Sequence, residues 1–472
     1  MKVGSRFLVL ALLIFGSLAG TSRAQTASET RSGSPMLLET AGKRVFFRAS
    51  NGAYRKELWK SSGTHSSTVL VKDINPTDCP GGCRSEWGRP GNFTNVGGTV
   101  FFTAAEDGND FDVWTSDGSE RGTLRLTDLQ EKPGTSGPHS LTAMKGMLFF
   151  SAYDGDSRRE LWRSDGTIEG TMMVKDINPK LHGGSSTGQL TKVGDTLFFT
   201  ARDGAHGTDL QLWKSDGTSG GTEMVADITP GEDSSLITSL TNVNGTLFFV
   251  HSTQLWMSDG TSEGTVMVKD FTLESGASGL ARSRLVNVAG ELFFSADDGV
   301  HGNELWRSNG TPGGTRMVAD INPSGPSFAT PLAPVGDSLF FAANDGAHGF
   351  ELFRSDGGKG STTMIKDIRP GKRNGIPSRL GNVFSDSAVV GDTLFLTAEN
   401  GKHGRELWRS DGTRAGTRMV SNISRKGSST PKWLTKARSR LFFSAFTPGK
   451  GRELWKSDGT GAGTTLVRDI WR

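Results

Sequence analysis

Short apolar segments recur along the chain, each bounded by turn-forming residues. One unit, which begins at Leu285, reads LVNVAGELFFSADDGVHGNELWRSNGTPGGTRMVADINPSG. Its segments LVNV, ELFFSA, ELWRS and TRMVADI have the length and composition of β-strands, and the Gly-, Asn- and Asp-rich stretches between them are typical of hairpins. Helical spacing of apolar residues does not occur after residue 24. The pattern predicts an all-β protein built from four-stranded units.

The unit occurs nine times. Each copy carries a Leu-Trp pair or its counterpart, and subtraction of successive aromatic positions gives spacings of 43 to 55 residues. A period of this size indicates supersecondary units that bury their apolar surface only against neighbouring units. The nine aromatic positions are Trp59, Trp114, Trp162, Trp213, Trp256, Trp306, Phe353, Trp408 and Trp455.

Two large apolar residues stand side by side in the second segment of every unit. Neighbours in a strand point to opposite faces of a sheet, so each sheet carries large apolar groups on both faces. A sheet with one wet face would show alternation instead. The pairs are Phe46-Phe47, Phe101-Phe102, Phe149-Phe150, Phe198-Phe199, Phe248-Phe249, Phe293-Phe294, Phe340-Phe341, Phe395-Leu396 and Phe442-Phe443.

Repeated four-stranded sheets that are buried on both faces fit the blades of a β-propeller, whose sequence periods are about 40 to 50 residues. We therefore predict one all-β domain over residues 36–472, a β-propeller of about nine four-stranded blades. Nine exceeds the usual four to eight blades, so an eight-bladed ring plus an accessory unit, or two smaller propellers, remain as alternatives. A β-solenoid is the rival fold, although its coils are usually shorter.

A turn motif, SDGT followed two residues later by Gly-Thr, joins the last two segments of a unit, as in Ser164 to Thr171. Its glycine is present in all nine units, which predicts a positive backbone torsion. The preceding Asp can accept hydrogen bonds from the turn, and we expect the later Thr to return its hydroxyl to it. The glycines are Gly63, Gly118, Gly166, Gly217, Gly260, Gly310, Gly357, Gly412 and Gly459.

At these residues the chain resembles the ELWxxDGT repeat family of secreted bacterial proteins, over nearly all of residues 36–472. The first unit, with SSGTHSST, and the seventh, with Phe353, depart from the pattern. The resemblance implies no particular reaction. The turn is also similar to the Asp-box of sialidase-type propellers, which implies that the SDGT turns lie at one end of the ring with the short hairpins. The longer connections, DGxHGxE and INPxGxSS, would then share the other end, where variable loops generally carry function.

Residues 1–24 have the features of a secretory signal, with Lys2 and Arg6 before an apolar run that is too short to span a membrane. Residues 25–35 are polar and are predicted to be a flexible lead-in. Removal of the signal leaves 53 − 3 = 50 basic residues against 50 acidic ones. A balanced surface argues against nucleic acid as a partner. Cys79 and Cys83 are predicted to form a local disulfide in the exported protein.

Candidate site residues are few. His206, His301, His348 and His403 occupy one repeat position, and they either form part of a ligand-binding ring or each bind their own hairpin. The repeated Asp of KDI lacks the spacing of a calcium loop, so no metal or other cofactor is predicted. Trp87 lies in a long insert, Thr77 to Pro90, and is a candidate for contacts with sugar or protein.

No unique carboxylate pair and no GxSxG motif occurs, so no catalytic residue is assigned. The sequence predicts a secreted or cell-surface, monomeric and non-catalytic scaffold that binds a protein or polysaccharide. The alternative is a propeller glycan hydrolase or lyase that acts at the loop-rich end.

Overall fold

The structure is a computed structural model, and it describes residues 32–52, 56–75, 88–106, 110–129, 137–153, 159–179, 184–206, 210–228, 236–275, 279–280, 283–379, 382–383 and 386–471. These residues form nine four-stranded antiparallel sheets and one two-stranded hairpin. Among them there is no helix of the length and apolar character needed to cross a membrane.

Each sheet consists of four strands that are consecutive in the chain. The strands of blades one to three are β1 (Met36–Ala41), β2 (Arg44–Ala49), β3 (Glu57–Ser61), β4 (Val69–Lys72), β5 (Gly88–Val96), β6 (Thr99–Ala105), β7 (Phe111–Ser116), β8 (Thr123–Arg125), β9 (His139–Met144), β10 (Met147–Tyr153), β11 (Arg159–Ser164) and β12 (Met172–Lys175). Those of blades four to six are β13 (Gly188–Val193), β14 (Thr196–Ala201), β15 (Gln211–Ser215), β16 (Glu223–Ala226), β17 (Ile237–Val243), β18 (Thr246–His251), β19 (Gln254–Ser258), β20 (Val266–Asp270), β21 (Val286–Val288), β22 (Glu291–Asp297), β23 (Asn303–Ser308) and β24 (Arg316–Ala319). Those of blades seven to nine are β25 (Thr330–Val335), β26 (Ser338–Asn344), β27 (Phe350–Ser355), β28 (Thr363–Lys366), β31 (Ser387–Val390), β32 (Thr393–Glu399), β33 (Arg405–Ser410), β34 (Arg418–Ser421), β35 (Lys432–Ala437), β36 (Arg440–Thr447), β37 (Gly451–Ser457) and β38 (Thr465–Arg468), and the hairpin β29 (Ser378–Arg379) and β30 (Asn382–Val383) precedes blade eight.

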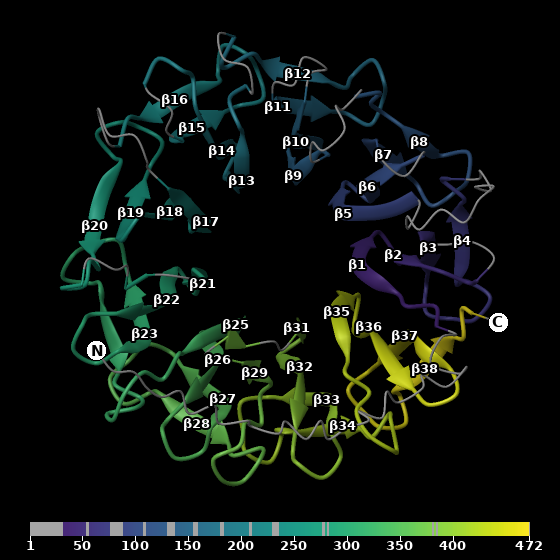
Figure 1. The fold of residues 1–472 in the computed structure, drawn as a ribbon, viewed down its shortest axis with the longest axis vertical. Helices are drawn as coiled ribbons and strands as arrows, with labels where there is room; N and C mark the ends of the chain where they lie inside the picture. The colour runs from purple at the N-terminus through teal and green to yellow at the C-terminus, as the bar shows by residue number, and fades with distance from the viewer. Residues whose placement is uncertain are drawn as a thin grey trace, which may run out of the picture.

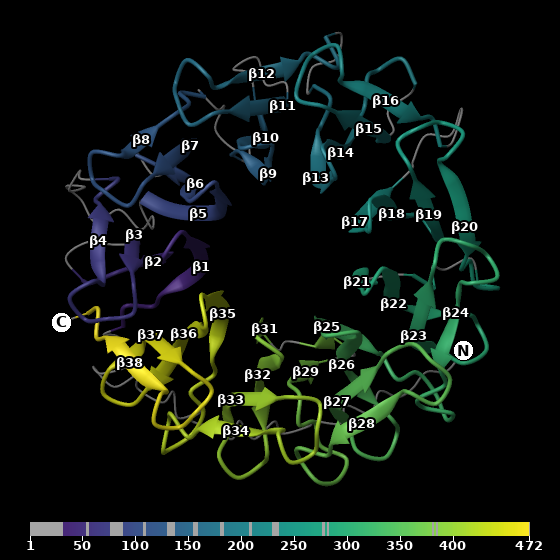
Figure 2. The same cartoon turned by 180° about the vertical axis from the view of Figure 1, so that it is seen from behind.

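The nine sheets stand around one ring, with the first strand of each blade nearest the centre and the fourth at the outside (Figure 1). The view from behind shows the same closed ring, in which blade nine lies beside blade one (Figure 2). The prediction of a nine-bladed β-propeller is therefore confirmed, and the alternatives of eight blades or two rings are excluded. Antiparallel order places the first and third turns of every blade at one end of the ring, the hairpin end. The second turn and the connection between blades lie at the other end, the loop end.

The core consists of nine apolar clusters, one at each junction between neighbouring blades. Phe46 and Phe47 illustrate why, since Phe46 packs in the cluster shared with blade two and Phe47 in the cluster shared with blade nine. Both rings are almost fully buried, at 1% and 0% exposure. The prediction of sheets buried on both faces is thus confirmed. Each unit obtains its core only from its neighbours.

The glycine of every SDGT turn lies against the preceding blade. A Cβ atom built on it would stand 2.8 to 3.4 Å from the ring Cζ of the first phenylalanine of that blade. All nine glycines have φ between +82° and +98°, which side chains rarely adopt. The glycine is therefore required both by the turn and by the close approach of two blades. The pairs run Gly63–Phe442, Gly118–Phe46, Gly166–Phe101, Gly217–Phe149, Gly260–Phe198, Gly310–Phe248, Gly357–Phe293, Gly412–Phe340 and Gly459–Phe395.

Hydroxyl pairs hold each turn together. The Ser164 and Thr171 hydroxyl oxygens are 2.7 Å apart, and the equivalent pair, seven residues apart, is present in all nine units at 2.7 to 3.0 Å. The expectation that the later Thr binds the turn Asp is wrong, because Asp165 instead accepts from the backbone and hydroxyl of Thr167. The buried Ser–Thr pair satisfies two polar groups at once.

Ring closure repeats the contact used inside the ring. At the junction of blades four and five, Lys214 Nζ donates to the Gly260 carbonyl oxygen at 2.8 Å. At the closing junction, Lys456 Nζ donates to the Gly63 carbonyl oxygen at 2.7 Å. The equivalent bonds of Lys60, Arg163 and Arg409 reach the glycine of their next blade in the same way. No special closing strand is needed, because β1 pairs with β2 of its own blade.

The segment before β1 completes the closure. The Ser34 amide donates to the Arg452 carbonyl oxygen at 2.9 Å, and the Gly33 amide donates to the Glu453 carboxylate at 2.6 Å. The Ile470 amide donates to the same carboxylate at 2.9 Å. One buried side chain of blade nine therefore binds both ends of the described chain. This segment belongs to residues 25–35, for which the sequence predicts a lead-in.

The glycine–phenylalanine contact predicts a specific stability difference. Gly217→Ala places a methyl group 2.9 Å from the Phe149 ring, at φ +98°. Gly98→Ala introduces the same backbone strain, at φ +97°, but its methyl group meets nothing within 4 Å. We expect Gly98→Ala to lower the free energy of unfolding by about 1 kcal/mol and Gly217→Ala by about 2–4 kcal/mol, because overpacking adds to strain. Urea unfolding measures both, and equal losses would contradict the contact.

Candidate functional site

The four repeated histidines lie at the loop end, each in the second turn of its own blade. The imidazole Nδ1 atoms of His206, His301 and His348 lie 2.8, 2.9 and 2.7 Å from the carboxylate of the Asp three residues earlier. His403 Nδ1 lies 3.2 Å from the Asn400 amide nitrogen. The neighbouring carboxylates, Asp298 and Asp345, raise the pKa of His301 and of His348. Each histidine thus binds its own hairpin, and in the described residues none of the four joins a potential metal-binding group.

Some candidates fall outside the residues that the structure describes. Trp87, Cys79, Cys83 and residues 1–24 are among them. The sugar- or protein-contact role of Trp87, the disulfide and the secretory signal stay predictions from sequence. Export and the resemblance to the ELWxxDGT repeat family likewise stay predictions.

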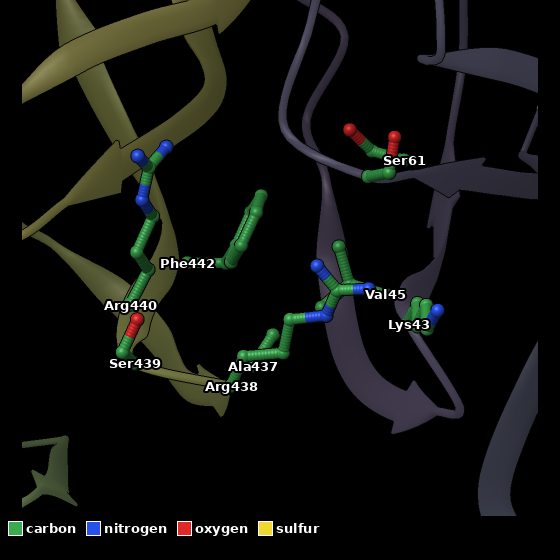
Figure 3. A pocket seen from close by; sticks show the side chains of 9 residues that line it. Lys43, Val45, Ser61, Ala437, Arg438, Ser439, Arg440 and Phe442 are labelled. Carbon is green, nitrogen blue, oxygen red and sulfur yellow. The ribbon is translucent and has the colours of Figure 1, made fainter.

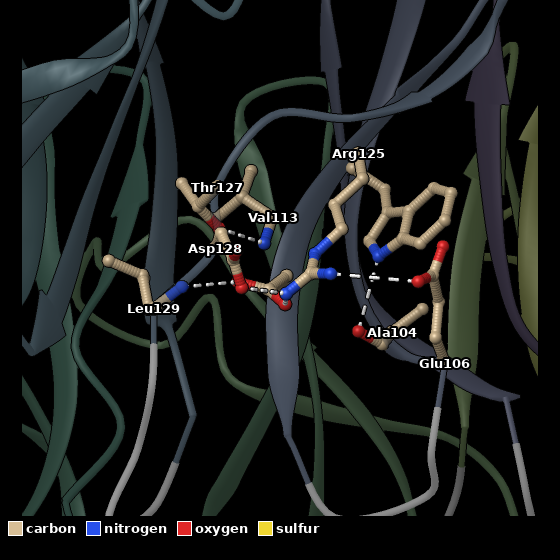
Figure 4. Close-up of polar contacts among 9 residues, drawn as sticks. Ala104, Glu106, Val113, Arg125, Thr127, Asp128 and Leu129 are labelled. Atoms are coloured by element: carbon tan, nitrogen blue, oxygen red, sulfur yellow. Dashed lines mark hydrogen bonds and ion pairs between the residues drawn. The ribbon is translucent and has the colours of Figure 1, made fainter. Parts of the chain in front are cut away.

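A group of carboxylates stands in blade two, where Asp110, Asp112 and Asp128 have oxygen atoms within 4.8 Å of one another. Arg125 lies among them, with Nη2 2.5 Å from Asp112 and 2.6 Å from Asp128 (Figure 4). Burial raises the pKa of Asp112 to about 6, although Leu129 and Thr127 donate hydrogen bonds to its carboxylate. The guanidinium supplies the positive charge that this group requires, so the geometry does not indicate a metal.

Other carboxyl groups with a raised pKa belong to the glutamate of the ELW motif. Burial raises the pKa of Glu57 and of Glu351 to about 8, and that of Glu453 to about 7. Shifts of this kind often mark catalytic acids. Here each carboxyl sits in a different blade and accepts the backbone amide seventeen residues later, as Glu351 does from Ile368 at 2.7 Å. The group holds the outgoing connection, and Gln211 does the same at 3.1 Å from the Ile228 amide.

One serine hydroxyl meets an imidazole in the described residues, where Ser140 Oγ lies 2.9 Å from His139 Nδ1. Burial and, to a smaller extent, the positive charge of Arg159 lower the pKa of His139 to about 4. A general base must become a stable imidazolium when it takes the serine proton. The cation beside His139 opposes that charge, and the hydrogen bonds of the pair include no carboxylate that orients the ring. This contact is not serine-peptidase machinery.

The chemistry that differs between blades lies at the start of the innermost strands. The nine units can be aligned on the first residue of the Phe pair. In this alignment the residue type varies among the blades at two positions near the start of the innermost strand, which lie twelve and nine residues before the Phe pair. We call the residues at these positions the inner rim. They lie at the loop end, where each innermost strand begins (Figure 1). Those described with their side chains are Ser34, Leu37, Arg89, Asn92, Ser140, Ser186, Gln189, Leu236, Ser239, Arg284, Phe328, Pro331, Asp386, Thr430 and Trp433.

Two aromatic residues of the inner rim are held in a costly conformation. Phe328 has φ +49° and Trp433 has φ +59°, and each side chain is 39% exposed. A bulky residue with positive φ costs about 1–2 kcal/mol. The equivalent positions of other blades carry no aromatic residue; they hold polar residues such as Ser34 and Ser140 or aliphatic ones such as Leu236. Other blades have the same positive φ at these positions, as at Ser34 with +44° and Ser140 with +56°, so the backbone conformation belongs to the repeat and the exposed aromatic rings are what distinguish blades seven and nine.

The inner rim was not found by the sequence-based search for repeated residues. Repetition pointed to His206 and its equivalents. In a repeat protein, however, a residue that recurs among the units is usually one that the fold itself needs, so repetition is a poor guide to a binding site. The signal was present, since Phe328 and Trp433 are the only aromatic residues at two repeat positions whose residue type varies among the nine units. Their exposure follows from the irregular start of each innermost strand, where the register shifts.

No protein-family profile matches the chain, and no curated protein sequence matches it. Solved structures are similar to part of the chain. One is a puromycin hydrolase, with a TM-score of 0.41 and 13% identity, over 76% of this chain and 58% of that one. Another is prolyl oligopeptidase B of Galerina marginata, with a TM-score of 0.41 and 11% identity, over 70% and 50%. A third is the acylaminoacyl peptidase of Pyrococcus horikoshii, with a TM-score of 0.35 and 10% identity, over 79% and 58%. The chain spans little more than half the length of these proteins.

These matches correct the predicted function. The sequence-based prediction was a secreted, non-catalytic scaffold for a protein or polysaccharide, with a glycan hydrolase or lyase as the alternative. The solved structures named above are a puromycin hydrolase, a prolyl oligopeptidase and an acylaminoacyl peptidase, and none is named as a scaffold or a glycan-processing enzyme. The prediction rested on the observation that Asp and Glu recur at the same positions in most units. Such recurrence identifies carboxylates with a structural role, such as Glu351. It gives no information about the class of ligand.

The buried ELW carboxyls predict a pH-dependent stability. Glu351 keeps its proton in the native state up to about pH 8, whereas the unfolded carboxyl releases it near its ordinary value of 4.5. The native state therefore holds the extra proton between these values, and the free energy of unfolding falls as pH rises through this window. We expect Glu351→Gln to make the fall shallower, and Gln211→Glu to make it steeper. Urea unfolding from pH 4.5 to 9 measures both, and curves parallel to that of the unsubstituted protein would contradict this.

Proposed function

We propose that the inner rim receives peptides, and that the ring is the substrate-receiving propeller of a peptidase. The observation that carries the proposal is the pair of exposed aromatic side chains, Phe328 just before the innermost strand of blade seven and Trp433 on that of blade nine. Aromatic groups at the mouth of a rigid ring supply contact area for apolar peptide side chains at little cost in conformational entropy.

The surroundings of these side chains suit a peptide backbone. Each innermost strand pairs with only one neighbour in its sheet, so its second edge faces the next blade around the centre of the ring. Threonine hydroxyls of the preceding blade bind part of this edge, as Thr142 does at the Leu190 carbonyl oxygen, and a peptide would bind the remaining groups. Hydroxyl and amide groups, as in Ser140 and Gln189, stand at equivalent rim positions of other blades. Asp386 Oδ2 accepts the Trp433 amide at 2.6 Å, which fixes the backbone that presents the indole.

The substrate class agrees with the names of the similar solved structures, which are peptidases. We propose binding and admission of the peptide as the task of this ring, and we assign no catalytic residue among the described ones. Because the chain spans only part of those proteins, the cleavage step is proposed to be supplied by residues other than the rim.

Peptide binding tests the proposal. Fluorescence anisotropy with a library of labelled peptides of about ten residues would identify binders of the exported chain. We expect apolar and aromatic peptides to bind, and the double variant Phe328→Ser with Trp433→Ala to weaken the affinity about tenfold or more, since each aromatic anchor contributes 1 kcal/mol or more.

Ile168→Ser is the matched control, because Ile168 is a 63% exposed apolar residue of an SDGT turn at the hairpin end. It should leave peptide affinity unchanged. Serine at position 328 is the residue that blades one and four carry there, Ser34 and Ser186, so the fold is retained. Absence of peptide binding, or equal binding by the double variant, would refute the proposal.

A further inference from the structure

A pocket of about 330 Å³ lies at the hairpin end, where blade nine meets blade one. We call it the seam pocket. Its walls come from the first turn of blade nine and from the first and third turns of blade one (Figure 3). The lining residues are Lys43, Val45, Ser61, Ser62, Ala437, Arg438, Ser439, Arg440 and Phe442. Three of these nine are cationic and none is acidic.

The charge of the seam pocket is inverted relative to other junctions of the same ring. Its cations are Lys43, Arg438 and Arg440, and Ser62 stands where seven blades carry the turn Asp. At the junction of blades six and seven, the equivalent positions hold three carboxylates, Glu291, Asp337 and Asp356. At the junction of blades seven and eight they hold Asp337, Asp392 and Asp411. The nine junctions share one backbone plan, so this difference is not required by the fold.

Arg438 occupies a turn position that has positive φ in every blade, with Lys145, Asn244 and Ala289 as the equivalent non-glycine residues of blades three, five and six. Arg438 is the first residue of its turn and has φ +57°, where blades one, two, four, seven and eight use glycine. An arginine in this conformation costs about 1–2 kcal/mol relative to an unstrained residue. Its side chain extends from blade nine toward blade one, on the side of Val45 and Lys43 (Figure 3). The strained turn therefore directs a guanidinium into the junction.

The described residues around the seam pocket do not neutralise the positive charge of Arg438. Lys456 is committed to the Gly63 carbonyl oxygen. Arg440 lowers the pKa of Asp458, although hydrogen bonds from Thr460 are the larger cause of that shift. Asp458 belongs to the turn of blade nine itself and does not line the seam pocket. The floor of the pocket is apolar, from Phe442 and Val45.

We propose that the seam pocket binds an oxyanion, the carboxylate, phosphate or sulfate group of a small ligand, through Arg438 and Lys43 with Arg440 at the opposite edge. Guanidinium groups match the planar or tetrahedral geometry of such anions and bind them with charge-assisted hydrogen bonds. The Phe442 and Val45 floor accommodates a short apolar body next to the charged group. The site is at the hairpin end, away from the inner rim, and it stands independently of the peptide-binding proposal.

Calorimetric titration with sodium phosphate, sulfate, acetate and benzoate, each against chloride at equal ionic strength, tests the proposal. We expect saturable binding of at least one of these anions. Arg438→Gly, Arg440→Thr and Ser62→Asp should each weaken it roughly tenfold or more, because each removes a charged hydrogen-bond donor or adds a repelling carboxylate. Preference for phosphate and sulfate identifies a phosphate or sulfate ester as the ligand class, and preference for acetate or benzoate identifies a carboxylate.

Each substitution installs a residue that other blades already carry at that position, so the variants are compatible with the ring. Unfolding midpoints verify this, and Arg438→Gly should be at least as stable as the original chain. Lys145→Gly removes a cation from the equivalent turn position of blade three, where Lys145 Nζ donates to the Asp216 carbonyl oxygen at 3.3 Å. It should leave anion affinity unchanged. No binding of any of the four anions, or equal affinity in the three seam variants, would overturn the proposal.

Discussion

The ring depends on the close approach of a turn glycine to a phenylalanine ring of the preceding blade. A Cβ atom would stand within 3.4 Å of that ring at every junction, including the closing one between Gly63 and Phe442. Because the turn is pinned to a neighbouring blade, the angle between blades is set by the same contact nine times. The apolar clusters follow from this spacing, since each phenylalanine pair then reaches into two junctions. Stability is distributed among neighbours rather than held in one centre.

Blades that depart from the repeat show which chemical groups the turn and the inter-blade connection require. Blade one replaces the turn Asp with Ser62, and Ser67 takes over by accepting the amides of Ser62 and Thr64. Blade four replaces the ELW glutamate with Gln211, whose amide oxygen still accepts the Ile228 amide. A negative charge is therefore not required at the turn Asp or at the ELW glutamate. The hydrogen bonds to the backbone amides are retained in both blades. By contrast, the glycine is never replaced.

The fold was predictable from the sequence for a physical reason. Adjacent phenylalanines such as Phe46 and Phe47 must point to opposite faces, and only sheets buried on both sides accommodate that pattern in nine copies. The sites were less predictable. Phe328 and Trp433 look like ordinary strand residues in sequence, and their strain and exposure depend on a backbone irregularity that no motif announces. Arg438 could not be separated from other surface cations until the seam placed it opposite Lys43.

The Glu453 carboxylate holds the amides of Gly33 and Ile470 at 2.6 and 2.9 Å, so the first and last described segments meet at one side chain. The closing junction then uses the same glycine contact as a junction inside the ring, although its side chains carry a different charge. The order in which the blades follow one another around the circle matters, but the point at which the polypeptide starts does not. A circular permutant with these ends joined, and with new ends opened in another inter-blade connection, retains every junction of the parent ring.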